Sequence, residues 1–114
     1  MDHTLPESPL PPCPGTPNCV RETHYFGTDA TTLFEQARTA LHTIGASQLR
    51  VHPETRRIDA VFTALVFKDD VALVIEPHAD GSVLHIRSAS RVGYSDLGVN
   101  RRRVRQFFRA LPDQ

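Results

Sequence analysis

Three candidate β-strands follow one another between residues 58 and 88, separated only by short polar or turn-forming segments. They mix apolar with β-branched or aromatic residues, as is typical of strands, and are Ile58–Phe67, Val71–Glu76 and Ser82–Ser88. Lys68–Asp70 is expected to form the first turn, and Pro77–Gly81, with its Asp-Gly pair, the second. Connections this short join antiparallel neighbours, because a parallel pair needs a crossover of a dozen or more residues. The sequence therefore predicts an antiparallel meander, to which Gln48–His52 can add a fourth strand.

A segment with helical periodicity precedes these runs. Its apolar residues recur at spacings of three to four, at Leu33, Phe34, Ala37, Leu41 and Ile44. Thr32 followed by Glu35 fits a capping box at the start, and Gly45 is suited to a left-handed end. We therefore expect a first helix on the N-terminal side of the sheet.

A second periodic segment lies near the C-terminus, where Val104, Phe107, Phe108 and Leu111 share one face. Pro112 is expected to end this helix. A helix, three or four antiparallel strands and a second helix predict an α+β domain with both helices on one face of the sheet.

Proline dominates the N-terminal segment, since six of the nine prolines fall within residues 5–18. Proline fixes φ and lacks an amide hydrogen, which argues against regular helix or central strand there. We expect residues 1–22 to form an irregular arm laid partly over the sheet, and residues 23–114 to form one α+β domain. A chain of 114 residues is long enough to fold in this way without a metal or a disulfide.

The charges balance overall but not locally. Residues 1–80 carry six basic and eleven acidic side chains, whereas residues 81–114 carry seven basic and two acidic ones. An anion site is therefore expected in the last third of the chain. The run Arg101–Arg103 with Arg105 resembles a nucleic-acid patch, but a solvated helix face explains it better, and the chain has no Trp for stacking. We expect no nucleic-acid partner.

The first residues have neither the basic nor the apolar region of a signal peptide. The longest purely apolar stretch, Val71–Ile75, is far shorter than the roughly 20 residues that cross a bilayer. We therefore expect no membrane partner, a cytoplasmic location, and a monomer or small homo-oligomer.

Cys13 and Cys19 leave three states open. Free thiols are favoured in a reducing cytosol, a short disulfide loop in an oxidising compartment, and a metal site would require His24 as a further ligand. Because the spacing departs from common zinc motifs, we expect no metal or cofactor.

The densest group of hydrogen-bonding side chains lies between the last predicted strand and the last helix. The candidate ligand-binding residues are Ser88, Ser90, Arg91, Asp96, Asn100, Arg101 and Arg103. A helix N-terminus beside arginines and hydroxyl groups has the donors that bind phosphate or carboxylate. Alternatively, Arg91 pairs with Asp96 while Asn100 and the serines satisfy buried loop backbone, as a structural network.

No reaction is predicted from these residues. Ser88 or Ser90 with His85 and Asp96 lacks a nucleophile-elbow motif, and nothing indicates an activated Cys19. The expected function is a non-enzymatic domain that binds a small anionic ligand at the loop of residues 88–103. The alternatives are a protein-interaction or scaffold module and, more remotely, a Cys/His metal site.

The run from Ser88 to Val104, S-A-S-R-V-G-Y-S-D-L-G-V-N-R-R-R-V, resembles the hallmark of the family called domain of unknown function 1499. Cys13–Val20 and Phe67–Val71 are similar to two further elements of that family, so the likeness extends from Cys13 to Leu111. The family has no established reaction, substrate or cofactor, and its members occur in bacteria and plastids. The resemblance implies only which positions matter: Cys13, Asn18, Cys19, Asp70, Ser88, Ser90, Arg91, Gly93, Asp96, Gly98, Asn100, Arg101 and Arg103.

The two main motifs are expected to meet in space. If the segment bearing Asn18 and Cys19 folds back over the sheet, it lies beside the loop of residues 88–103. In that case Cys13, Asn18, Cys19 and Asp70 form a second segment of the same site.

Overall fold

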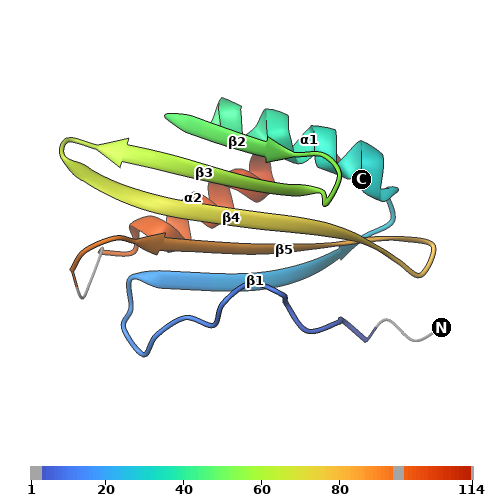
Figure 1. Cartoon of the computed structure of the whole chain (residues 1–114), viewed down its shortest axis with the longest axis horizontal. Coiled ribbons are helices and arrows are strands. Elements are labelled where there is room, and N and C mark those ends of the chain that lie inside the picture. Colours follow the sequence, from blue (N-terminus) through green and yellow to red (C-terminus); the bar gives the residue numbers. More distant parts are fainter. Residues whose placement is uncertain (1–3, 94–96, 114) are drawn as a thin grey trace.

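The computed structural model describes residues 4–93 and 97–113. It contains one five-stranded antiparallel sheet and two helices (Figure 1). In chain order the elements are β1 (Cys19–Phe26), α1 (Ala30–Thr43), β2 (Gln48–His52), β3 (Arg57–Ala64), β4 (Phe67–His78), β5 (Gly81–Ser90) and α2 (Val99–Ala110). The strand order is β1-β5-β4-β3-β2. The α+β class and the antiparallel sheet are confirmed, whereas the expected three or four strands are corrected to five.

The additional strand is β1, which pairs with β5 over its whole length, from Cys19 opposite Ala89 to Phe26 opposite Ser82. The sequence of β1 did not predict a strand because its apolar alternation is weak. Val20 and Phe26 pack against the core, but Glu22 and His24, on the same face, are polar. An edge strand tolerates this mixture, since part of each face meets solvent. The sheet thus begins at Cys19, inside the range expected to be irregular.

Lys68–Asp70 is not a turn. These residues belong to β4, where Asp70 lies opposite Val61 of β3 and opposite Ala89 of β5. The reversal between β3 and β4 instead uses Leu65 and Val66, and Leu65 has a left-handed φ of 58°. The polar run can belong to a strand because its two carboxylates form ion pairs with arginines in the fold. The actual turn carries apolar residues, which turn statistics disfavour.

Both helices pack on one face of the sheet and form the core with it (Figure 1). Leu33 and Leu41 of α1, with Val104 and Phe107 of α2, are at most 1% exposed. They meet the alternate residues of the central strands that point the same way, namely Ile58, Leu73, Ile75, Leu84 and Ile86. The predicted apolar faces of both helices are confirmed.

The helix ends agree in part with the predictions. Gly45 has the expected left-handed φ of 102°, and α2 ends at Ala110, just before Pro112. The N-cap of α1 is Asp29 rather than Thr32, since Asp29 Oδ2 accepts a hydrogen bond from the Thr32 amide at 3.0 Å. The capping box was therefore placed three residues too late.

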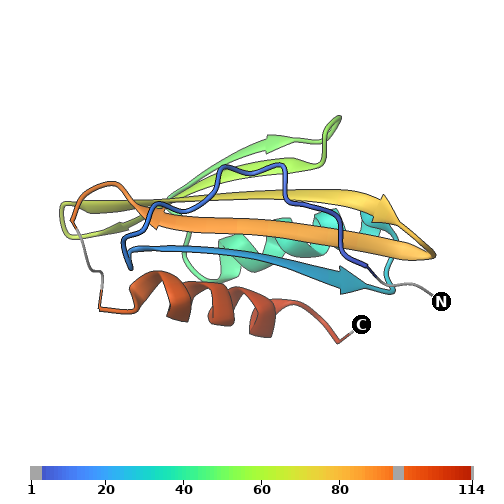
Figure 2. The same cartoon turned by 90° about the horizontal axis from the view of Figure 1, so that it is seen from below.

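Residues 4–18 form no helix or strand. Figure 2 shows this segment, in dark blue, running along the sheet on the face opposite the helices. Leu10 is 2% exposed, and Arg21 of β1 donates hydrogen bonds to the main-chain oxygens of Ser8 and Leu10, each at 3.1 Å. These contacts hold the segment against β1. Within residues 4–93 and 97–113, no helix combines the length and apolarity required to cross a membrane.

Candidate functional site

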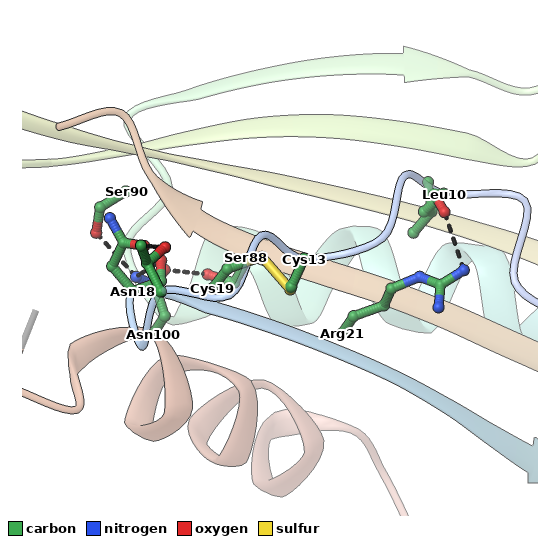
Figure 3. Close-up of a disulfide and its surroundings, with 9 residues drawn as sticks. Leu10, Cys13, Asn18, Cys19, Arg21, Ser88, Ser90 and Asn100 are labelled. Atoms are coloured by element: carbon green, nitrogen blue, oxygen red, sulfur yellow. Dashed lines mark hydrogen bonds between the residues drawn. A yellow bond between two sulfur atoms is a disulfide. The ribbon is translucent and has the colours of Figure 1, made fainter. Parts of the chain in front are cut away.

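Asn100, in the first turn of α2, is the centre of a buried hydrogen-bond cluster (Figure 3). Its Oδ1 accepts from Ser88 Oγ at 2.6 Å and from Arg103 Nη1 at 2.8 Å. Its Nδ2 donates to Ser90 Oγ at 2.9 Å and to the main-chain oxygen of Asn18 at 3.2 Å. An amide side chain has two acceptor sites and two donor hydrogens, so the protein itself satisfies all four.

The positions of these side chains follow from the two secondary-structure periods. Ser88 and Ser90 alternate onto the helix-covered face of β5, and Asn100 and Arg103 lie one turn apart on one side of α2. Because α2 begins close to the end of β5, the two pairs face each other. We call Asn18, Ser88, Ser90, Asn100 and Arg103 the polar cluster.

Arg103 connects the polar cluster to β4. Its Nη2 lies 2.7 Å from Asp69 Oδ2, and the two side chains are only 12% and 14% exposed. Its guanidinium carbon lies 4.7 Å from the centre of the Phe62 ring. The charge of Arg103 is therefore neutralised by a partner within the fold. This arginine is not available as an anion-binding group in the way the sequence suggested.

The predicted meeting of the two motifs is confirmed. The main-chain oxygen of Asn18 accepts from the Ser90 amide at 3.1 Å as well as from Asn100. The side chain of Asn18 donates to the main-chain oxygen of Gly93 and accepts from Thr16 Oγ1 at 2.7 Å. Asn18 is 7% exposed. Asn18 therefore links the start of β1 to the end of β5 and to the first turn of α2 by hydrogen bonds.

Cys13 and Cys19 form a disulfide that encloses Asn18 (Figure 3). Of the three states that the sequence left open, the structure has the disulfide and no free thiols at these positions. The remote hypothesis of a Cys/His metal site loses both of its thiolate ligands, because a bonded sulfur is not a thiolate. In the described part of the chain, no group of three His, Cys, Asp or Glu side chains is placed to hold a metal ion.

Arg91 pairs with Asp70 through two hydrogen bonds of 2.9 Å each, from Nε and from Nη2. These bonds, together with the charge of Asp70, raise the pKa of Arg91. Both side chains are about half exposed, at 46% and 53%. The partner proposed from sequence, Asp96, lies outside the described residues. The residue that caps α2 is Gly98, with a left-handed φ of 81°.

His85 lies on the opposite face of β5 from Ser88 and Ser90, so the structure keeps its imidazole apart from these serines. Its Nδ1 lies 2.8 Å from Thr23 Oγ1, and its Nε2 lies 3.3 Å from Glu76 Oε1 without hydrogen-bond geometry. Burial lowers the pKa of His85, against an opposing effect of Glu76. The imidazole is fully buried, which leaves no access for a substrate.

An exposed apolar surface at one end of the molecule was not predicted. Of the six large hydrophobic side chains that are exposed among the described residues, five lie there: Leu65 (92%), Val66 (85%), Phe67 (57%), Val92 (64%) and Leu97 (86%). We call these five residues the apolar end. The signal in the sequence was the run Ala64–Phe67, which was assigned to a strand because it is apolar.

The apolar end is assembled from two connections. Leu65, Val66 and Phe67 belong to the β3–β4 hairpin, and Val92 and Leu97 to the connection between β5 and α2. Figures 1 and 2 both show these connections at the same end of the sheet. A hydrogen bond of 3.1 Å from the Arg91 amide to the Lys68 main-chain oxygen joins them directly. Four exposed cations stand beside them: Lys68, Arg91, Arg101 and Arg102.

The fold and this site define a small α+β domain with a buried polar cluster beneath an exposed apolar end. The chain matches the family model described as protein of unknown function (DUF1499) over residues 9–111, and it belongs to that family. The resemblance seen in its motifs is therefore confirmed. No match was found among curated proteins.

Proposed function

We propose that this domain is a non-enzymatic docking module, and that the apolar end is the surface that meets its partner. The observation that carries the proposal is the exposure of five large apolar side chains on two adjacent connections, with cations beside them. Most of the large hydrophobic side chains of the domain are buried in one core. A concentrated exposed group of such side chains, flanked by charge, is typical of an interaction surface.

The polar cluster supports this function by holding the surface in place. Asn100 fixes the start of α2 to β5 and to the residue preceding β1. The Asn18 side chain reaches Gly93, which follows Val92 directly. A surface fixed before binding loses less conformational entropy when the partner docks. The motifs of the family thus contribute a support, and the neighbouring apolar residues contribute the contact.

A small-anion site at the same loop is the other candidate. It is less well supported, because Ser88, Asn100 and Arg103 are bonded to one another and to Asp69. Of the expected ligands, Arg101 is exposed and stands at the start of α2, where a helix N-terminus favours an anion. Titration with inorganic phosphate tests this candidate: a specific thermal stabilisation that is lost in Arg101→Ala supports it, and no stabilisation rejects it.

The disulfide bears on the location of the protein. Bonded cysteines are uncommon in a reducing cytosol and persist in oxidising compartments. The Cys13–Cys19 bond therefore supports an oxidising compartment over the cytoplasmic location expected from sequence. Alkylation of thiols in intact cells, followed by mass spectrometry of the chain, distinguishes the two: a bonded pair resists alkylation and a reduced pair takes up two labels.

Site-specific photo-crosslinking in cells tests the docking surface. A photoreactive amino acid replaces Val66, and in the control it replaces Glu54, an exposed residue in the turn at the other end of β3. We expect an adduct from position 66 that is lost when Leu97→Ser is added, and none from position 54. Equal adducts from both positions, or none from position 66, would contradict the proposal.

A further inference from the structure

Building on the docking function proposed above, we infer that the partner of the apolar end is the surface of an anionic lipid bilayer. The inference goes beyond the docking surface itself because it names the chemistry of the occupant. It depends on three features of this end: the shape of the hairpin, the distribution of charge and the rigidity of the support.

The hairpin presents its apolar side chains outward. Ala64 pairs with Phe67, so that Leu65 and Val66 form the tip alone, and they are 92% and 85% exposed. Protruding aliphatic side chains need a partner that closes around them. A fluid acyl layer does so without a preformed pocket, whereas a protein partner would need a fitted cavity for each side chain.

The narrow tip also limits the depth of insertion. A turn exposes main-chain polar groups, and these carry a high penalty in the hydrocarbon core. The tip therefore suits the boundary between headgroups and acyl chains, where Leu, Val and Phe side chains gain most of their transfer energy while the backbone stays hydrated. The second connection presents Val92 and Leu97 beside it, which enlarges the apolar contact.

The charges near the tip favour anionic headgroups. Asp69 is neutralised by Arg103 within the fold, and Asp70 is paired with Arg91. Lys68, Arg101 and Arg102 then give this end an excess of positive charge among the described residues. Cations close to a membrane surface are attracted by its negative potential over about a Debye length. The balanced net charge of the whole chain hides this local excess.

Hydrogen bonds link the described residues of the two connections to each other and to α2. The main-chain bond from Arg91 to Lys68 holds them together, and Arg102 Nη1 donates to the main-chain oxygen of Leu97 at 3.0 Å. Apolar residues and cations are thus presented together on the same end of the sheet. This combination of aliphatic tips and adjacent cations is the arrangement that binds peripherally to membranes.

Vesicle co-sedimentation with the full purified chain tests the inference. The probes are vesicles of phosphatidylcholine alone and vesicles in which about one-third of the lipid is phosphatidylserine. We expect binding to the anionic vesicles, little binding to the neutral ones, and a decrease as salt rises. Val66→Ser combined with Leu97→Ser should weaken binding by about tenfold or more, since it removes two aliphatic contacts. Arg101→Ala combined with Arg102→Ala should weaken it severalfold, and Glu54→Ser should leave it unchanged.

Fluorescence gives an independent readout that uses the folded protein. The chain contains no tryptophan, so Val66→Trp introduces a single reporter at the tip, and Glu54→Trp is its matched control. On adding anionic vesicles, we expect a blue shift in Val66→Trp and none in Glu54→Trp. Circular dichroism and the unfolding midpoint establish that each variant is folded.

Two results would overturn the membrane proposal. One is the absence of binding to anionic vesicles at low salt, and the other is equal binding by wild type and Val66→Ser/Leu97→Ser. If photo-crosslinks at position 66 then join the chain to a protein, the docking surface stands and only its lipid partner is rejected. If position 66 gives no adduct either, both proposals are rejected.

Discussion

The side-chain amide of Asn100 donates a hydrogen bond to the main-chain oxygen of Asn18 at 3.2 Å, across 82 residues of sequence. The same oxygen accepts from the Ser90 amide at 3.1 Å. One carbonyl group therefore joins the residue before β1, the end of β5 and the first turn of α2. The side chain of Asn18 also donates to the main-chain oxygen of Gly93, which follows Val92.

Asp69 and Asp70 are adjacent in sequence but should differ strongly in their contribution to stability. Asp69→Ala leaves the nearly buried guanidinium of Arg103 without its carboxylate, and we expect the free energy of unfolding to fall by about 3 kcal/mol. Asp70→Ala removes a half-exposed pair with Arg91 that solvent screens, so this change should cost far less stability than Asp69→Ala. Urea unfolding of both variants measures the difference. Equal losses would show that the Arg103 pair is not the stronger one.

The disulfide should stabilise the fold by restricting the unfolded chain. The bond joins residues six apart, and closing so short a loop is worth about 2 kcal/mol in the chain-entropy account. Reduction of the wild-type protein by dithiothreitol should therefore lower the free energy of unfolding by about this amount. The Cys13→Ser/Cys19→Ser variant should match the reduced protein and show no response to dithiothreitol. If reduction leaves the unfolding curve of the wild type unchanged, the loop is held by its other contacts.

His85 should make stability depend on pH. Burial lowers its pKa in the folded state, Arg21 acts in the same direction, and Glu76 opposes them. In the unfolded chain the imidazole has a pKa of about 6.5, so the neutral buried His85 contributes fully to the free energy of unfolding above that pH. As pH falls towards the folded-state pKa, only the unfolded chain takes up the proton, and stability is lost at up to about 1.4 kcal/mol per pH unit.

The test compares urea unfolding of wild type and His85→Gln between about pH 5 and 7. His85→Gln should be less stable throughout, because it alters a buried site, but its stability should fall less steeply as pH decreases. His42→Gln, at an exposed position in α1, should retain the wild-type slope. A His85→Gln curve parallel to wild type would show that another group causes the dependence.

The periodic elements were predictable because burial imposes a pattern on them. The apolar faces of both helices repeat at helical spacing, and β2 was expected with the bounds that the structure shows. The strand β1 escaped because Glu22 and His24 interrupt its apolar face at an edge, where burial is incomplete. The run Lys68–Asp70 has the composition of a turn, and its partners in the fold, Arg103 and Arg91, come from distant segments.

The sequence indicated which polar segments meet in space but not how their side chains bond to one another. Dense polar residues outside the periodic elements pointed correctly to Asn18, Ser88 and Asn100 as neighbours. Sequence spacing did not reveal that these groups satisfy one another, since that depends on which strand face and helix turn each residue occupies. The apolar end was missed for the opposite reason. Leu65 and Val66 have the composition of a buried strand, and only the hairpin geometry places them in solvent.

Urea unfolding of Asn100→Ala beside Arg101→Ala shows whether the polar cluster is a structural support for the exposed docking surface. Asn100→Ala leaves Ser88, Ser90 and the Asn18 carbonyl without their shared partner, so the free energy of unfolding should fall by about 2 kcal/mol or more. Arg101→Ala, one residue away but exposed, should stay within about 0.5 kcal/mol of wild type. An Asn100→Ala variant as stable as wild type that has lost phosphate-induced stabilisation would contradict the account, because the cluster would then be a ligand site.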